Sequence, residues 1–365
     1  MNNNMLGIYI HIPFCLKKCS YCDFNSSDSL NHLKRDYITA LINEINNSDI
    51  TDPTDSVFIG GGTPSSIETP LLIAVISAVK GKFPHGNLEF TVEVNPATLS
   101  LDGFCTLRAA GVNRISFGLQ SAIDDELKTL GRIHSYADFL ASYQNARRAG
   151  FDNINVDLMF SLPDQTLEKW QYTLDTVLDV KPEHLSCYSL IIEQGTPFYD
   201  MKLNLPDDET DRAIYEFTVN HLTNNGYKHY EISNFALPNK ECRHNIKYWQ
   251  RENYLGFGTG AASLYGNMRC QNSSDIQIYI DSNVKSAEML SRHDIINEHI
   301  FLRLRMIEGI DLAEFKSTFG FDFLQRYSEI ISKYEKSGLI SVDTHCRLTL
   351  DGISVSNTIM SDFLI

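Results

Sequence analysis

One stretch near the start of the chain is the strongest indication of its fold: Tyr9-Ile10-His11-Ile12-Pro13-Phe14-Cys15-Leu16-Lys17-Lys18-Cys19-Ser20-Tyr21-Cys22-Asp23-Phe24. It begins in a β-rich apolar run, and three cysteines follow at spacings of four and three residues. Three thiols on a loop just after a strand can converge on one inorganic centre. Zinc is one interpretation, but a structural zinc site wants four ligands, and no fourth Cys or His follows at a finger-like spacing. Three thiolates also fit a [4Fe-4S] cluster with one iron left open.

The composition is that of an ordinary folded protein. The chain has 365 residues, of which 43% are hydrophobic and 21% charged, so it can bury a large core. Its formal charge of -15 repels nucleic acid and anionic lipid, and its apolar stretches are shorter than the roughly 18 residues of a membrane span. Eight cysteines are too sparse for a disulfide scaffold. We therefore expect a cytoplasmic protein with no transmembrane segment and no nucleic-acid partner.

Short β-rich runs alternate with helical segments up to about residue 190, a pattern typical of βα units around a parallel sheet. Glycine in Ala110-Gly111 and Ala149-Gly150 fits the end of a helix just before a strand. The expected strands are Ile8–Ile12, Val57–Ile59, Leu88–Val94, Arg114–Phe117, Ile154–Phe160 and Leu185–Leu190, and the expected helices include Tyr37–Ile45, Leu71–Val79, Tyr136–Arg148 and Leu167–Leu178. Six such units predict an α/β fold with an open, partial (β/α)6 barrel.

The rest of the chain is expected to form a connecting segment and a small C-terminal domain. Residues 233–289 are rich in Asn, Gly and Tyr and are predicted to be irregular. The expected elements around them are a helix at Asp208–Asn225, a strand at Tyr227–Ile232, helices at Ile295–Met306, Leu312–Phe319 and Leu324–Ser337, and a hairpin at Leu339–Leu350. This order predicts a mainly helical, winged-helix-like domain at 290–365, after a barrel at 1–234 and a connecting segment at 235–289.

Glycines and charged side chains stand in or after the predicted strands. Gly60-Gly61-Gly62-Thr63-Pro64 follows the second strand, where glycine lets backbone groups approach a ligand, although the same residues fit a plain tight turn. A charged residue in an apolar strand, such as Glu93 or Asp157, is costly unless it faces a ligand-filled cavity or has a partner. The alternative is a structural ion pair with Arg132 or Arg114.

The cysteine pattern, Cys-x3-Cys-x2-Cys after the first strand of a βα barrel, resembles the radical S-adenosylmethionine (SAM) superfamily. In that superfamily the open iron is chelated by the amino and carboxylate groups of SAM. Three further stretches, Val112-Asn113-Arg114-Ile115-Ser116, Cys187-Tyr188-Ser189-Leu190 and Glu193-Gln194-Gly195-Thr196-Pro197-Phe198, resemble the oxygen-independent coproporphyrinogen III oxidase (HemN-like) family. Residues 231–236, 241–249 and 256–263 are similar to its HemW branch, the haem chaperones. The likeness runs through nearly the whole chain.

This resemblance implies a cluster site and a SAM site. Carried over residue by residue, it makes Cys15, Cys19 and Cys22 the ligands of a [4Fe-4S] cluster. The SAM contacts that it implies are Tyr9, Tyr21, Gly62, Thr63, Glu93, Gln120, Arg132 and Asp157. One position departs from the dehydrogenase branch, because its Cys-x-Cys pattern is replaced here by Cys22-Asp23-Phe24. This departure argues against coproporphyrinogen oxidation.

The motif His244-Asn245-Ile246-Lys247-Tyr248-Trp249 is a candidate haem site. On a helix, His244 and Tyr248 share a face at positions i and i+4. Imidazole can ligate haem iron, Tyr248 and Trp249 could cover the porphyrin, and Arg243 and Lys247 could meet the propionates. From the residues alone, a histidine and two aromatics filling a core seam is the preferred interpretation. The resemblance reverses that preference.

Two functions of different classes follow from the resemblance. The first is a haem chaperone that binds haem and a SAM-chelated [4Fe-4S] cluster and transfers haem to an acceptor haem protein, for instance a respiratory one, with an electron donor as a further partner. The second is a radical SAM oxidoreductase that oxidatively decarboxylates coproporphyrinogen III to protoporphyrinogen IX. The sequence leaves open whether the chain turns over a substrate and whether it forms a homodimer.

Overall fold

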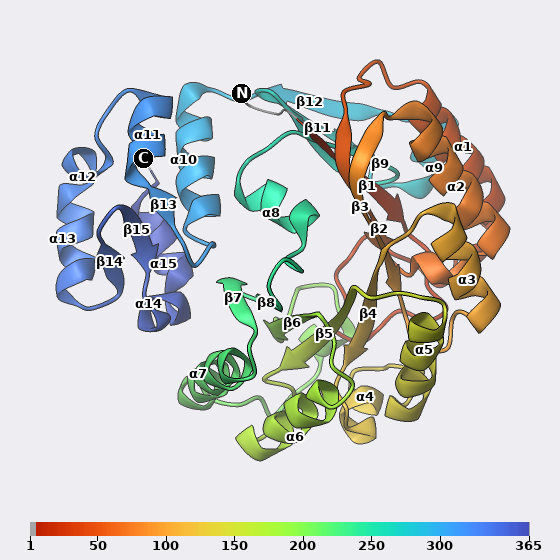
Figure 1. Cartoon of the computed structure of the whole chain (residues 1–365), viewed down its shortest axis with the longest axis horizontal. Coiled ribbons are helices and arrows are strands. Elements are labelled where there is room, and N and C mark those ends of the chain that lie inside the picture. The colour runs from red at the N-terminus through yellow and green to blue at the C-terminus, as the bar shows by residue number, and fades with distance from the viewer. Residues whose placement is uncertain (1–4, 365) are drawn as a thin grey trace.

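A twelve-stranded sheet in the order β12-β11-β10-β9-β1-β2-β3-β4-β5-β6-β8-β7 runs through the computed structural model, which describes residues 5–364 (Figure 1). Its strands from β1 to β6 are all parallel to one another. They are β1 (Leu6–Ile12), β2 (Thr54–Gly61), β3 (His85–Val94), β4 (Arg114–Gln120), β5 (Ile154–Phe160) and β6 (His184–Ser189). Every expected barrel strand is present, and the partial (β/α)6 barrel is confirmed.

Helices cover the outer face of these strands (Figure 1). They are α1 (Lys34–Asn46), α2 (Thr69–Lys82), α3 (Leu101–Ala110), α4 (Asp124–Thr129), α5 (Tyr136–Arg148), α6 (Leu167–Leu178) and α7 (Asp208–Asn224), with 3-10 turns η1 (Asn31–Leu33), η2 (Pro64–Ser66) and η3 (Pro197–Asp200) in the loops. Gly111 ends α3 at a φ of 103°, as the Ala-Gly pair predicted. Within residues 5–364, no helix combines the length and the apolar character needed to cross a membrane.

The expectation that residues 233–289 are irregular is wrong, because most of this segment lies in short strands and helices, and the strands extend the sheet at both edges. Strand β8 (Asn234–Ala236) pairs antiparallel with β6 and with β7 (Lys228–Glu231), which is the strand predicted at Tyr227–Ile232, and β9 pairs in parallel with β1. The other elements here are α8 (Arg243–Trp249), β9 (Tyr254–Phe257), β10 (Ala262–Tyr265), β11 (Met268–Asn272), α9 (Ile276–Ser282) and β12 (Lys285–Met289). Strands this short show no readable period and form because a neighbouring strand is present.

A buried carboxylate ties these added strands to the barrel. Glu44 of α1 accepts hydrogen bonds from the Gly258 N–H at 2.9 Å, the Tyr279 hydroxyl at 2.6 Å and the Asn272 amide at 2.9 Å. Glu44 also pairs with the cation of Lys285, whose Nζ lies 2.7 Å from Glu44 Oε1. One side chain therefore joins α1 to the turn after β9, to β11, to α9 and to β12.

The C-terminal part forms helices packed around a three-stranded antiparallel sheet in the order β13-β15-β14, on one side of the barrel and next to α8 (Figure 1). The elements are α10 (Arg292–Arg303), β13 (Ile310–Asp311), α11 (Leu312–Phe319), α12 (Phe323–Arg326), α13 (Ser328–Lys336), β14 (Ile340–Val342), β15 (His345–Leu348), α14 (Leu350–Ser354) and α15 (Ser356–Asp362). The predicted helix at Leu324–Ser337 is split at Tyr327, whose buried ring packs on Phe323 and Phe363. The expected helices and hairpin are otherwise present.

Side chains of the central strands alternate between the outer helices and the interior of the barrel. The outward set is apolar, and Ile154, Val156 and Leu158 of β5 are fully buried. A parallel sheet covered on both faces normally carries apolar side chains on both of them. Here the inward set is largely polar and includes Tyr9, Phe58, Glu93, Arg114, Ser116, Asn155, Asp157, Ser186 and Tyr188. An interior of this kind suits a polar ligand better than a packed core.

Candidate functional site

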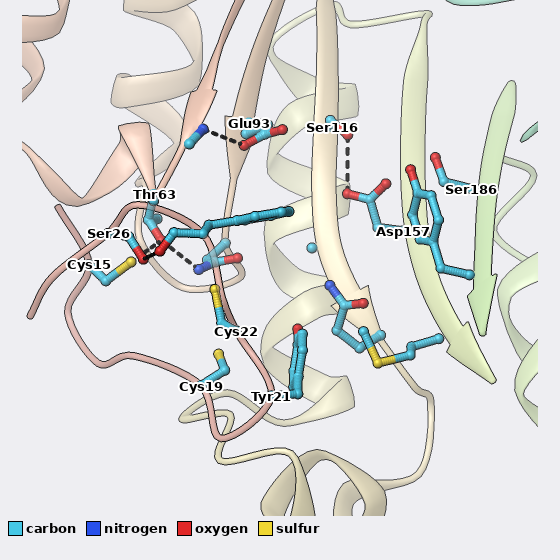
Figure 2. A pocket seen from close by; sticks show the side chains of 18 of the residues that line it. Cys15, Cys19, Tyr21, Cys22, Ser26, Thr63, Glu93, Ser116, Asp157 and Ser186 are labelled. Atoms are coloured by element: carbon cyan, nitrogen blue, oxygen red, sulfur yellow. Dashed lines mark hydrogen bonds between the residues drawn. The ribbon is translucent and has the colours of Figure 1, made fainter. Parts of the chain in front are cut away.

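A cavity of about 550 Å³ lies inside the barrel, between the cysteine loop (residues 15–22), the central strands and helix α8. Figure 2 shows the three cysteines on this loop at one side, and Glu93, Ser116 and Asp157 on the strands across from it. All the predicted cluster and SAM residues line this cavity: Tyr9, Cys15, Cys19, Tyr21, Cys22, Gly62, Thr63, Glu93, Gln120, Arg132 and Asp157.

The cysteine loop brings three free thiols to the cavity wall. The Thr63 hydroxyl donates a hydrogen bond to Cys15 Sγ at 3.7 Å. Burial raises the pKa of the Cys15 and Cys22 thiols, so a metal centre has to displace their protons. In the described chain no three Cys, His, Asp or Glu side chains are grouped closely enough to hold a single metal ion. Three thiols without a fourth protein ligand fit a cluster with one open iron.

The glycine-rich turn after β2 packs directly against the cysteine loop. The Thr63 N–H donates to the Phe14 carbonyl at 2.8 Å. A Cβ atom on Gly62 would lie 2.8 Å from the same carbonyl oxygen, and a Cβ on Gly60 would lie 2.8 Å from the carboxyl carbon of Glu93. Glycine is therefore required at these two positions because the backbone passes so close to the cysteine loop and to Glu93. A plain tight turn would not need this close approach.

A chain of hydrogen bonds holds Arg132 beside the cysteine loop. The Arg132 guanidinium donates to the Tyr21 hydroxyl at 2.7 Å and to Asn95 Oδ1 at 3.1 Å, and the Asn95 amide donates to Thr63 Oγ1 at 2.8 Å. Gln120 ends β4 at a φ of 78°, next to a bulge that turns the strand end. The sequence analysis did not predict Asn95 as a site residue. It could have been found from its position directly after β3, because the glycine turn follows β2 in the same way.

Glu93 and Asp157 face the cavity from the strands, and within residues 5–364 neither has a cationic partner. Glu93 accepts a hydrogen bond from the Gly61 N–H at 3.2 Å, and Asp157 accepts from Asn155 at 2.7 Å and from Ser116 at 3.3 Å. Among the described residues neither carboxylate forms an ion pair with an arginine, so the structural alternative is not realised. Burial and the charge of Asp157 raise the pKa of Glu93 to about 8. This environment fits a cationic ligand, and SAM carries a sulfonium and an ammonium group.

Helix α8 closes the other end of the cavity and carries the candidate haem residues. His244 is buried, with Nδ1 3.0 Å from Ser56 Oγ and Nε2 2.8 Å from the Tyr248 hydroxyl. Burial lowers the pKa of His244 to about 3, so the imidazole is neutral, the form that ligates iron. His244 and Tyr248 both line the cavity, as their i, i+4 spacing predicted.

The remaining residues proposed for haem point elsewhere. Trp249 is not among the cavity-lining residues, and its ring stacks on the Arg305 guanidinium at 4.5 Å. Lys247 Nζ is buried and pairs with Asp55 at 3.0 Å and with Glu252 at 2.7 Å, which leaves it unavailable to a propionate. One residue step turns a helix by about 100°, so the residue after Tyr248 leaves the cavity face. The cavity-facing part of the motif is His244 and Tyr248.

Several residues of the cavity wall were missed by the sequence analysis. They are Phe58, Ser116, Asn155, Ser186 and Tyr188, and each lies on a central strand. Asn155 and Asp157 are two residues apart on β5, and the other strands show the same spacing. A period of two along a parallel strand, with polar residues on one face, was the signal that could have found them.

Comparisons with known proteins agree with this geometry. The radical SAM superfamily matches residues 9–177, and the HemN C-terminal domain matches residues 290–355. Heme chaperone HemW of Bacillus subtilis is 37% identical, with 99% of each chain covered. Heme chaperone HemW of Escherichia coli is 40% identical over 70% of this chain and 69% of its own. Among solved structures, coproporphyrinogen III oxidase (HemN) of Escherichia coli has a TM-score of 0.87 at 24% identity, and the match covers 99% of this chain and 90% of that one.

The fold and the cysteine site define this chain as a radical SAM protein with a HemN-type C-terminal domain. The solved HemN structure supports the fold alone. The full-length similarity to curated relatives is more specific: the chain belongs to the HemW family. Membership of the radical SAM superfamily implies a [4Fe-4S] cluster and SAM.

Replacing Cys19 by serine is expected to abolish cluster assembly without unfolding the chain, because Cys19 is a partly exposed loop residue. The measurement is iron content and visible absorbance after anaerobic reconstitution, with circular dichroism as the test of folding. Cys105→Ser, at an exposed position of α3, is the matched control and should retain the full cluster. A Cys19→Ser chain with undiminished iron would contradict the assignment.

Replacing Glu93 by glutamine is expected to stabilise the ligand-free chain and to weaken SAM binding. The pKa of this carboxyl group rises from 4.5 to about 8 on folding. The free energy of unfolding of the protein therefore falls as the pH rises from 4.5 to 8, and the loss is complete above pH 8. Above pH 8 the variant should gain at least about 1 kcal/mol in the free energy of unfolding, since each pH unit between the two pKa values corresponds to about 1.4 kcal/mol.

The SAM affinity of the unaltered chain should rise with pH up to about 8, because a cationic ligand favours the ionised Glu93. The affinity of Glu93→Gln should lack this dependence. Urea unfolding and calorimetric titration measure the two effects. A variant that is less stable above pH 8 and binds SAM with the same pH profile would show that the carboxylate does not serve the ligand.

Proposed function

We propose that this chain is a haem chaperone, which binds haem and a SAM-chelated [4Fe-4S] cluster in one cavity and transfers haem to an acceptor haem protein. The name of its HemW relatives supports this function. The structural observation that carries the proposal is an aromatic wall at the α8 end of the cavity, opposite the cysteine loop.

This wall is a series of stacked rings. The Tyr9 and Phe58 ring centroids lie 6.5 Å apart at an interplanar angle of 28°, and those of Phe58 and His244 lie 5.5 Å apart at 26°. Tyr248 meets His244 edge-on, at 5.0 Å and 86°. Flat rings next to a neutral imidazole suit a planar macrocycle that carries an iron. A ligand of that kind is haem.

The opposite end of the cavity suits the cluster and SAM. The three cysteines of the loop would hold the cluster, Arg132 offers a guanidinium to an anionic group, and Glu93 and Asp157 face a cationic one. When bound, the cluster and SAM supply one-electron chemistry, so an electron donor is a further expected partner. Hydrogen bonds to Tyr21 and Asn95 fix the orientation of the Arg132 guanidinium before SAM binds.

The alternative function, oxidative decarboxylation of coproporphyrinogen III, has less support. Phe24 stands at the cavity mouth with 63% of its surface exposed, at the position where the dehydrogenase branch resembled by this chain has a cysteine. Anaerobic incubation with coproporphyrinogen III, SAM and a reductant should therefore release no carbon dioxide and give no vinyl product by mass analysis. Decarboxylated product in excess of a Cys19→Ser blank would replace the chaperone proposal by the enzymatic one.

Replacing His244 by alanine is expected to weaken haem binding at least about tenfold, because the variant loses the imidazole ligand. The Soret band during a haem titration measures the affinity. Tyr248→Phe removes only the hydroxyl bonded to Nε2 and should preserve or strengthen binding, because it frees that nitrogen. His293→Ala removes an exposed imidazole and should change nothing. If Tyr248→Phe loses haem while His244→Ala keeps it, the tyrosine is the ligand and our assignment is wrong.

A further inference from the structure

Arg114 is a buried guanidinium that the proposed roles leave unused. It is the first residue of β4, its side chain is 1% exposed, and it lines the cavity. Among the described residues its guanidinium forms no hydrogen bond and no ion pair, and Nε is buried without any partner. A buried cation in this state is costly unless a bound group supplies the missing acceptors.

The neighbouring acidic side chains are already engaged by other donors. Glu89 accepts hydrogen bonds from the backbone N–H groups of Arg243 at 3.0 Å and His244 at 3.1 Å, and so anchors the start of α8. Asp157 is held by Asn155 and Ser116, as described above. Burial opposes the charged form of Arg114 and these negative charges favour it, but neither carboxylate forms an ion pair with the guanidinium among the described residues.

The position of Arg114 selects one end of the cavity. It lies close enough to α8 that its positive charge helps to keep His244 neutral, after burial and Lys247. Arg132, the other guanidinium of the cavity wall, lies at the cysteine end and is held by Tyr21 and Asn95. The α8 end thus combines an aromatic wall, a neutral imidazole and an unpaired guanidinium.

We propose that Arg114 binds a propionate carboxylate of the tetrapyrrole and thereby sets the orientation of the macrocycle in the cavity; this inference rests on the haem chaperone function proposed above. A guanidinium presents two parallel N–H donors that match a carboxylate, and the pair is strongest where water is excluded. The negative charge of the propionate also satisfies the buried cation. Glu93 and Asp157 remain for the cationic groups of SAM.

The test compares haem with haem dimethyl ester, in which both propionates are uncharged, on the full-length chain. The unaltered chain should bind haem roughly thirtyfold or more tightly than the diester, as expected when one partner of a buried charge pair is removed. Arg114→Gln should lose affinity for haem by a similar factor and bind both forms almost equally. Arg114→Lys, which keeps the charge and loses the fork, should retain part of the preference.

Two controls separate this site from general charge effects and from SAM. Arg148→Gln removes an exposed cation at the end of α5 that does not line the cavity, and it should preserve the preference for haem. Arg114→Gln should bind SAM, measured by calorimetry, with unchanged affinity. Circular dichroism and thermal unfolding establish that each variant is folded. The comparison of haem with its diester on the unaltered chain tests the proposal even if a variant fails to fold.

Each outcome points to a different conclusion. If the unaltered chain binds haem and the diester equally, the propionate assignment fails while the chaperone function stands. If it binds neither, the proposed function itself fails. If Arg114→Gln loses SAM and keeps its preference for haem, the carboxylate held by Arg114 belongs to SAM, and the inference is overturned.

Discussion

In the part of the chain that the structure describes, Glu93, Asp157 and Arg114 face the interior of the barrel without forming an ion pair, and the rest of the site follows from that constraint. The period of two along each strand sends residues such as Ile154 and Val156 to the helices and turns the alternate residues inward. Glu93, Asp157 and Arg114 are thereby withdrawn from water around one cavity, which costs free energy until bound groups supply the counter-charges. In the proposed function the bound ligands supply these counter-charges, and the protein gives up stability to bind them.

The cavity has two chemically different ends because two separate segments close it. At one end the glycine turn after β2 holds the cysteine loop through backbone hydrogen bonds that any side chain on Gly62 would disrupt. At the other end the Glu89 carboxylate fixes the first N–H groups of α8, which places His244 against Phe58. A soft sulfur site and an aromatic wall therefore share one space, as a protein that handles both a cluster and a macrocycle requires.

Contacts from outside the barrel keep α8 in this position. Arg305 stacks on Trp249, the Ile232 N–H donates to the Arg305 carbonyl at 3.1 Å, and Arg251 pairs with Glu298 of α10 at 2.9 Å. The C-terminal domain thus supports the helix that closes this end of the cavity. Trp249 contributes to that support on the outer face of α8, while His244 and Tyr248 face inward.

Features that depend on the spacing of neighbouring residues can be read from the amino-acid sequence. Three cysteines within eight residues, long alternating strands and helices such as α5 and α6, and the i, i+4 pair of His244 and Tyr248 can all be predicted, because each is set by a few neighbouring residues. Tertiary structure alone decided the rest. Strands of four or five residues such as β9 form only because β1 offers a partner far away in the sequence, and whether Glu93 or Asp157 would pair with Arg114 depended on distances across the barrel. Those distances leave the two carboxylates and Arg114 without ion pairs among the described residues, and no local pattern encodes them.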